Sequence, residues 1–397
     1  MHNEVLGDVR VLDFTTIVSG PYCTRLLADL GAEVIKIEPP DGDFIRTQPP
    51  LRSGKSAYFA HLNCGKKSVA LDLQKPCAAE IARALAAKSD VVVENGRPGV
   101  MAKLGLDYSM LACINPRLVY CSISGFGQTG PWAKRSAYAP MLHAASGFDL
   151  LNLSYQPGLE RPLNTGIYVG DVLGGTYAFG AIQTALLNRE RTGRGDHVDL
   201  SMIDAMLGMM IYEFQEAQFP QSKRATTFQP TRAKDGFIMI AAVKPNNFEA
   251  LARAVGHPEW MRDLRFGSPR GRAENWAAFM AALDEWASAR TAAECEATLN
   301  AGGVPCSRYH TVAEAQAHNQ FEARDSFATI DDSAGPLKVP NPAFKLLNAT
   351  ARARNYVPEL GADNAPVLSG LLGYSREHIA ELYRQTVLHG AHQAREV

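Results

Sequence analysis

Short apolar runs alternate along the first half of the chain with longer stretches whose apolar residues recur at helical spacing. Strands that alternate with helices of about 10 residues are typical of βαβ units around a parallel sheet. The apolar runs predict strands over residues 9–14, 32–38, 68–73, 90–95 and 118–124. Helices are expected over 21–31, from Pro76 onward and over 108–116. We therefore predict an α/β protein whose large domain, residues 1–225, has a Rossmann-like fold.

The pattern changes after residues 192–218, which predict one more strand followed by a long helix. A polar, irregular stretch follows. Helical patterns near 246–255, 272–289 and 292–301 then lie between short apolar runs that predict strands. We place a smaller α+β domain at residues 226–330. Residues 331–397, with a helix predicted over 376–385, are expected to return to the large domain.

Composition and charge narrow the class of protein. The chain has 397 residues, of which 46% are apolar and 20% charged, and its formal net charge is −1. Such a balance attracts neither nucleic acid nor an anionic membrane. No apolar run approaches the roughly 20 residues that span a bilayer, and the first residues lack the layout of a signal peptide. The seven cysteines are scattered and form no metal-binding or disulfide pattern, so we expect a cytoplasmic protein without a metal site.

Two short motifs resemble nucleotide-binding loops, but the residues around each motif do not fit such a loop. GFGQTG, residues 125–130, follows a predicted strand, but Pro131 comes next and no helical stripe starts there. A dinucleotide-binding loop needs that helix. SGKS, residues 53–56, ends like a P-loop but lacks its first glycine. The pairs Lys66-Lys67 and Lys134-Arg135 are expected to face solvent or to meet phosphates.

Asp171 stands out because it lies in an apolar, glycine-rich stretch, GIYVGDVLGGTYAFGAI. Small residues occupy positions 170, 174, 178, 181 and 185, a spacing that puts them on one helix face. Another backbone or a ligand can approach such a face closely. Asp171 is then either a helix N-cap or a carboxylate kept ionised by the helix dipole, which can act as a nucleophile.

Six blocks of sequence, in order, resemble the class III CoA-transferase (CaiB/BaiF) family. They are LDFTTIVSGPYCTRLLADLGAEVIKIEPPDGD, LNCGKKSVALDL, VVVENGRPGVMAKLGL, SISGFGQTGP, VGDVLGGTYAFGAI and RTGRGDHVDLSMIDA. The family includes formyl-CoA transferase, carnitine CoA-transferase and α-methylacyl-CoA racemase. The resemblance covers essentially the whole chain and implies a homodimer of interlocked subunits.

The resemblance also implies a mechanism and a binding site. Asp171 matches the family's nucleophile, which forms an aspartyl anhydride and then an aspartyl-CoA thioester. CoA and acyl-CoA are then substrates, and no tightly bound cofactor or metal is required. The segments that match the family's CoA contacts comprise Val18, Ser19, Leu71, Asp72, Leu73, Gln74, Asn95, Gly96, Arg97, Lys103, Ala137 and Tyr138.

Two departures from the family pattern bear on the substrate. Tyr138 stands where the racemase branch has a histidine, and a tyrosine with an ordinary pKa of about 10 is a poor base near neutral pH. The glycine-rich loop of formyl-CoA transferase is missing. Arg224, Arg232 and Lys234 lie in the corresponding region, where they either face solvent or meet a second carboxylate.

We therefore expect a CoA-transferase that acts between an acyl-CoA and a small carboxylic acid, for which a dicarboxylate such as succinate is one candidate. A racemase-like enzyme and a non-catalytic CoA-binding protein on the same fold remain the alternatives.

Overall fold

The structure, a computed structural model, describes residues 4–156, 158–220, 228–242 and 244–390. The chain forms two compact units. The large unit consists of Met1–Ala217 together with Arg324–Val397, and the small unit of Gln218–Ala323.

A six-stranded sheet forms the centre of the large unit. Its strands are β1 (Arg10–Asp13), β2 (Glu33–Glu38), β5 (Lys66–Ala70), β6 (Val91–Glu94), β7 (Val119–Ser124) and β8 (His197–Ser201). They lie in the order β5-β2-β1-β6-β7-β8, and all neighbours are parallel. Ranked along the chain this is the order 3-2-1-4-5-6 of a doubly wound Rossmann sheet. The predicted α/β class with a parallel sheet is thereby confirmed.

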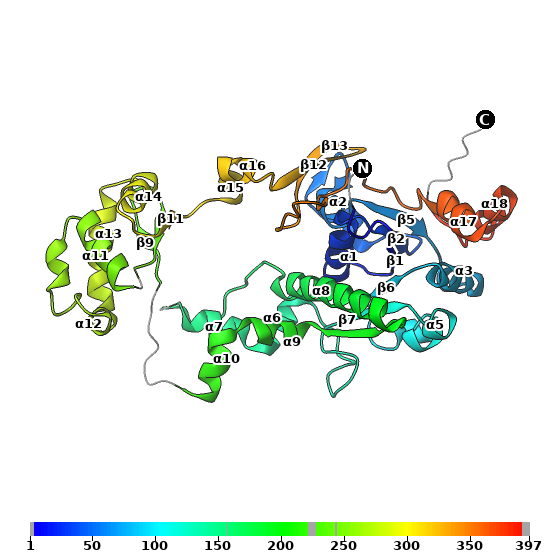
Figure 1. The fold of residues 1–397 in the computed structure, drawn as a ribbon, viewed down its shortest axis with the longest axis horizontal. Coiled ribbons are helices and arrows are strands. Elements are labelled where there is room, and N and C mark those ends of the chain that lie inside the picture. Colours follow the sequence, from blue (N-terminus) through cyan, green and yellow to red (C-terminus); the bar gives the residue numbers. More distant parts are fainter. Residues whose placement is uncertain (1–3, 157, 221–227, 243, 391–397) are drawn as a thin grey trace. The chain divides into compact units, whose positions relative to one another are not determined.

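Helices cover both faces of this sheet (Figure 1). Successive strand residues point to opposite faces, so Val11 joins one core and Leu12 the other. The first core is closed by α1 (Ser19–Asp29) and α8 (Val169–Thr192). The second is closed by α3 (Pro76–Ala87), α5 (Tyr108–Ile114), α17 (Asn364–Leu372) and α18 (Arg376–Arg384). The C-terminal helices therefore pack on the sheet that the N-terminal half forms.

Two glycines of α8, Gly174 and Gly175, serve helix packing. A Cβ on Gly175 would lie 2.6 Å from the carbonyl oxygen of Ser19 in α1, and one on Gly174 would lie 2.7 Å from the side chain of Met202. Only glycine permits such close approach of two helices. Protein therefore covers this face of α8 at Gly174, whereas Ala181 and Ala185 line a cavity of about 830 Å³.

The remaining elements of the large unit surround the sheet. They are η1 (Phe44–Thr47), β3 (Leu51–Arg52), β4 (Lys55–Ser56), α2 (Ala57–Asn63), α4 (Val100–Lys103), α6 (Ala139–Ser146), α7 (Phe148–Ser154), α9 (Met202–Met209), α10 (Ile211–Gln218), β12 (Phe327–Asp332) and β13 (Gly335–Pro340). The single long helix expected after β8 is two helices, because Met210 leaves helical geometry at φ −83°, ψ 60°. The strand β12, which the sequence pattern grouped with the smaller domain, belongs to the large unit.

The small unit has its own core around a three-stranded antiparallel sheet. Its strands are β9 (Thr231–Arg232), β10 (Phe237–Ile240) and β11 (Cys306–Arg308). Its helices are α11 (Pro245–Ala254), η2 (Pro258–Met261), α12 (Pro269–Glu274), α13 (Trp276–Ser288), α14 (Ala292–Ala301), α15 (Val312–Ala317) and α16 (Asn319–Ala323). The helix expected over 272–289 is interrupted at Asn275, where α12 ends and α13 begins.

Candidate active site

Asp171 lies in the first turn of α8 but is not the cap of this helix. The N-cap is Tyr168, and no side chain caps the helix. The backbone N–H of Ala139, the first residue of α6, instead acts to lower the pKa of the Asp171 carboxyl group. The interpretation of Asp171 as an N-cap is therefore wrong, and its side chain meets the start of a second helix.

Two cavities meet at this carboxylate. The larger has a volume of about 420 Å³, and the smaller has about 220 Å³. Four residues line both: Ile17, Val18, Tyr138 and Asp171. A molecule in either cavity therefore reaches the same side chain.

The smaller cavity lies at the switch point of the sheet. The strand order reverses between β1 and β6, and the segments that follow these two strands, Thr16–Ser19 and Asn95–Pro98, line the cavity. Open α/β sheets bind ligands at this place. Gly125 and Ala137 also line this cavity. Residue 125 must be glycine because a Cβ there would lie 2.1 Å from the Cβ of Ala137. The GFGQTG motif thus forms a loop beside the cavity rather than the start of a helix.

The larger cavity is mostly aromatic and aliphatic. Besides the four shared residues it is lined by Phe44, Ile45, Gln48, Pro49, Tyr58, Ala139, Pro140 and Tyr168. None of these lining residues is Lys or Arg, so its hydrogen-bond donors are tyrosine hydroxyls and the Gln48 amide.

Burial changes the acidity of two groups at the site. Burial raises the pKa of Asp171 to about 6. The backbone N–H of Ala139 has a smaller, opposite effect on this pKa. We expected the helix dipole to favour the ionised form, but removal from water is the larger effect. Burial, then the neighbouring Tyr168 and Asp171, also raise the pKa of Tyr58 to about 12. At neutral pH, Asp171 is therefore mostly ionised and Tyr58 remains a hydroxyl donor.

The raised pKa of Asp171 predicts a pH dependence of any reaction in which its carboxylate attacks. Only the ionised form is a nucleophile, so kcat/KM should fall about tenfold per pH unit as the pH drops below about 6. An aspartate with an ordinary pKa would keep its activity down to about pH 4. Initial rates between pH 4.5 and 8, with circular dichroism to check folding at each pH, measure this. A profile that stays flat to pH 4.5 would contradict it.

The structure brings some of the expected CoA contacts together and leaves others apart. Val18, Ser19, Asn95, Gly96, Arg97, Ala137 and Tyr138 all line the smaller cavity. Leu71 to Gln74 and Lys103 line neither cavity. Leu71 is fully buried, and Lys103 is exposed at the end of α4. The assignment of these residues to CoA stays a prediction.

The side chain of Asn95 already has partners. Its amide oxygen accepts the N–H of Thr16 at 2.9 Å, and its amide nitrogen donates to the carbonyl of Thr16 at 2.8 Å. Asn95 therefore holds the loop after β1 in place.

Several residues of the site were not found from the sequence. Phe44, Ile45, Gln48, Pro49, Tyr58 and Tyr168 reach the larger cavity. They come from three different segments, and only Tyr168 stands close in sequence to a predicted site residue. Arg135, which was expected from the sequence to face solvent or to meet phosphates, lines the smaller cavity. Arg224 lies outside the described residues. Arg232 is in the small unit, where its guanidinium lies 5.7 Å from the centre of the Phe237 ring.

Neither a metal site nor a membrane span is present in the ranges that the structure describes. There, no three His, Cys, Asp or Glu side chains form a group that could hold a metal ion. No helix among them combines the length and the apolar character needed to cross a bilayer.

The sequence matches one family along most of its length. The profile described as CoA-transferase family III matches residues 6–364. The acetyl-CoA:oxalate CoA-transferase of Acetobacter aceti is 37% identical, over 84% of this chain and 87% of the relative. The succinyl-CoA–D-citramalate CoA-transferase of Chloroflexus aurantiacus is 32% identical, over 96% of this chain and 98% of the relative.

The fold matches that of solved structures. A CaiB/BaiF family protein from Brucella suis superimposes with a TM-score of 0.83 at 33% identity. The match covers 94% of this chain and 100% of the other.

Proposed function

The chain belongs to CoA-transferase family III, and we propose that it carries out CoA transfer through Asp171. A CoA-transferase moves CoA from an acyl-CoA thioester to a carboxylic acid. The observation that supports Asp171 is its position: a half-buried carboxylate where two cavities meet, one at the switch point of the sheet and one with an aromatic wall. A nucleophile that reacts with both CoA and a carboxylic acid must be accessible to each of them, and each cavity gives access to Asp171.

The proposed reaction consists of four exchanges at this carboxylate. Asp171 attacks the thioester carbonyl, and the CoA thiolate leaves as an aspartyl anhydride forms. The thiolate then attacks the aspartyl carbonyl, which releases the first acid and gives an aspartyl-CoA thioester. The acceptor carboxylate attacks that thioester and expels the thiolate, which gives a second aspartyl anhydride. The thiolate then attacks the acyl carbonyl of this anhydride, which forms the new acyl-CoA and frees the Asp171 carboxylate. Covalent catalysis divides one difficult exchange into steps between acyl groups of similar energy.

The two cavities suit different parts of the substrates. Arg97 and Arg135 reach the smaller cavity, together with Ser19, Ser124 and Ser136. Such groups bind the amides and phosphates of CoA. The aromatic wall of the larger cavity suits the acyl group and the acid, and the hydroxyl of Tyr58 can donate to a developing oxyanion.

We propose a short dicarboxylic acid as acceptor. The two relatives described above are named for oxalate and for D-citramalate with a succinyl-CoA donor. In the larger cavity a second carboxylate would meet the tyrosine hydroxyls and the Gln48 amide.

A panel of substrates tests this proposal. Succinyl-CoA and acetyl-CoA are each incubated with oxalate, succinate and glutarate, and with propionate and butyrate as monocarboxylic controls of similar size. We expect transfer to at least one dicarboxylate with a kcat/KM at least about tenfold above either control. Transfer only to monocarboxylates would contradict the acceptor class. Deuterium incorporation at the α-carbon of 2-methylacyl-CoA, without CoA transfer, would favour the racemase alternative.

We further propose that the protein is a cytoplasmic homodimer and that CoA enters as a substrate rather than as a bound cofactor. The resemblance to interlocked dimers of the family supports the assembly. Light scattering at micromolar concentration measures it, and a monomer there contradicts it.

A further inference from the structure

A strained residue lines both cavities. Ile17 has a φ of +69°, a left-handed conformation that is rare for a β-branched side chain. Conformations of this kind cost about 1–3 kcal/mol and persist only when surrounding contacts hold them. Ile17 lies in the wall beside Asp171, so what holds its backbone also sets the shape of the site.

The segment around Ile17 is held at each residue. Asp13 accepts the N–H of Thr15 at 2.8 Å, and Lys36 donates to the carbonyl of Thr15 at 2.6 Å. Asn95 binds both backbone groups of Thr16. The N–H of Ile17 itself donates to Oδ1 of Asp43 at 3.3 Å. The backbone of three successive residues is therefore fixed by side chains from other parts of the chain.

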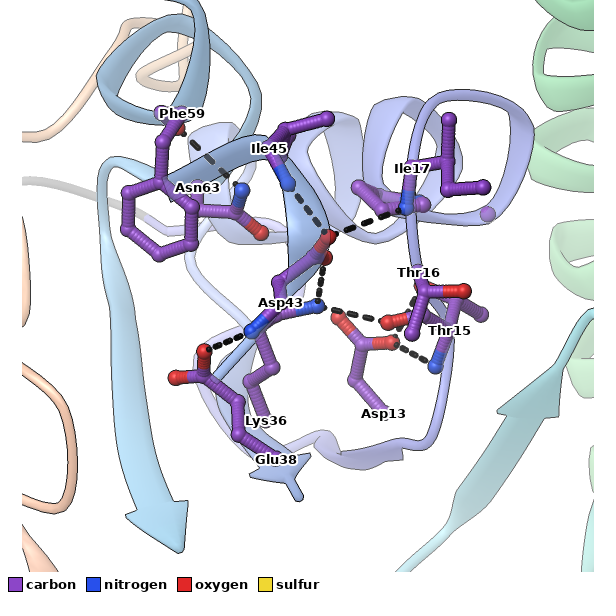
Figure 2. A network of polar contacts seen from close by, with 12 residues as sticks. Asp13, Thr15, Thr16, Ile17, Lys36, Glu38, Asp43, Ile45, Phe59 and Asn63 are labelled. Atoms are coloured by element: carbon purple, nitrogen blue, oxygen red, sulfur yellow. Dashed lines mark hydrogen bonds and ion pairs between the residues drawn. The ribbon is translucent and has the colours of Figure 1, made fainter. Parts of the chain in front are cut away.

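Asp43 connects this segment with a second segment of the wall of the larger cavity. Its Oδ1 accepts the N–H of Ile17 and also that of Ile45, the latter at 3.2 Å (Figure 2). Ile45 and its neighbour Phe44 line the larger cavity. One carboxylate oxygen thus joins two wall residues, Ile17 and Ile45, that are 28 positions apart in sequence.

A buried ion pair holds Asp43 in turn. Its Oδ2 lies 3.0 Å from Nζ of Lys36, and both side chains are fully buried. Its own N–H donates to Glu38 at 3.0 Å. Figure 2 shows Asp43 between Lys36, Ile17 and Ile45, and the residue is buried. Asp43 does not line either cavity, so it acts on the site only through the residues that it holds.

We infer that Asp43 is a positioning residue of the transfer site: it holds the Ile17 segment and the Phe44–Ile45 segment at the spacing that keeps the acyl group against Asp171 and water away from it. This inference rests on the proposed function. Displacement of a substrate by about 1 Å costs on the order of 100-fold in rate. A loosened wall also lets water replace the acceptor carboxylate, so that acyl-CoA and water give free acid and CoA.

The test compares Asp43→Ala and Asp43→Asn with a matched buried aspartate. Asp29 is also buried and pairs with a basic side chain, Arg25, at 2.9 Å, but it lines neither cavity. Asp29→Ala is therefore the control for a purely structural effect. Transfer and thioester hydrolysis are measured for all variants at a temperature at which circular dichroism shows them folded.

We expect Asp43→Ala to lower the kcat of transfer by about 10- to 100-fold and to raise the hydrolysed share of the acyl-CoA severalfold. Asp43→Asn, which keeps an acceptor oxygen, should lose less. Asp29→Ala should leave kcat within about twofold, whatever it does to thermal stability.

Three outcomes would overturn the inference. In the first, folded Asp43 variants keep the wild-type kcat and hydrolysed share. In the second, Asp29→Ala changes both as much as Asp43→Ala does. In the third, the wild-type protein transfers no CoA from any donor, and the proposed function fails with the inference. If Asp43→Ala does not fold, the same comparison of kcat and hydrolysed share is made with Asp43→Asn alone, and wild-type values for this variant overturn the inference.

Discussion

Asp171→Asn should abolish CoA transfer, with kcat lowered by at least about 10³-fold, and should leave the fold intact. The amide is nearly the same size as the carboxylate, but it cannot carry an acyl group through an anhydride or a thioester. Incubation of the wild-type protein with acyl-CoA alone, followed by hydroxylamine, should leave a hydroxamate on the peptide that contains residue 171. Mass spectrometry of that peptide and the rate of transfer measure the two expectations.

The stability of Asp171→Asn should not fall, and at pH 7.5 it should rise by about 1 kcal/mol. Burial raises the pKa of Asp171 to about 6 from its ordinary value of 3.8. A carboxyl group with a raised pKa contributes stability below its unfolded pKa, and this contribution is lost as the pH rises through the folded pKa. At pH 7.5 the folded protein therefore bears the cost of a buried charge, which an asparagine does not carry. Urea denaturation of both proteins at pH 7.5 measures the difference.

Asp204 supplies the control for this experiment. It also lies in the first turn of a helix, α9, but is exposed and lines neither cavity. Asp204→Asn should keep transfer within about twofold. An Asp171→Asn protein that transfers CoA, shown by mass to be free of deamidation, would remove Asp171 from the mechanism.

The sheet could be predicted from the sequence because it depends on local patterns. Each predicted strand of the first half overlaps an observed one, since buried parallel strands are continuous apolar runs. Asp171 could be singled out for a related reason: a carboxylate in an apolar helix start is costly and needs an explanation. Helix interruptions at Met210 and Asn275 were missed, because no proline marks either position.

The walls of the site could not be predicted, because they depend on contacts between distant segments. Phe44 lies in η1 and Tyr58 in α2, short helices that no motif marks in the sequence, and they line one cavity with Asp171 only once the chain has folded. Lys66 was expected to face solvent or phosphate, and this was wrong: it is fully buried. A lysine inside a strand gives no sign in the sequence of the partner that neutralises it.

The buried charges at the carboxyl end of β1 form one network that connects stability with the site. Asp13 lies 3.1 Å from Lys66, and its other carboxylate oxygen holds Thr15, the first residue of the clamped segment. Burial acts to raise the pKa of Asp13, but the Lys66 and Lys36 ammonium groups, with hydrogen bonds from the Thr15 and Thr24 side chains, together outweigh it and lower the pKa to about 2. Asp13 is therefore ionised at neutral pH, and its buried charge depends on both lysine partners for neutralisation.

Lys66→Met should destabilise the large unit by about 3–5 kcal/mol. The ammonium group of Lys66 donates to Asp13, to the carbonyl of Pro21 at 3.1 Å and to Asn63 at 2.9 Å. A methionine of similar length removes the charge and leaves Asp13 buried with one ammonium partner fewer, which is the costly way to break a buried ion pair. Urea denaturation gives the free energy of unfolding, and hydrogen exchange of the β1 and β5 amides shows whether the loss is in the large unit.

Lys67→Met is the matched control, because it makes the same chemical change one residue further along β5. The Lys67 side chain is 42% exposed and pairs with Glu33 at 2.5 Å, so water screens this ion pair and little stability depends on it. We expect a change within about 1 kcal/mol and unaltered exchange at β1. If the two variants lose equal stability, the network around Asp13 does not depend on the buried charge of Lys66, and packing of the side chain alone explains its position. If only Lys66→Met unfolds the end of β1, transfer activity should fall with it, because the segment that begins at Thr15 would lose the Asp13 contact that holds it.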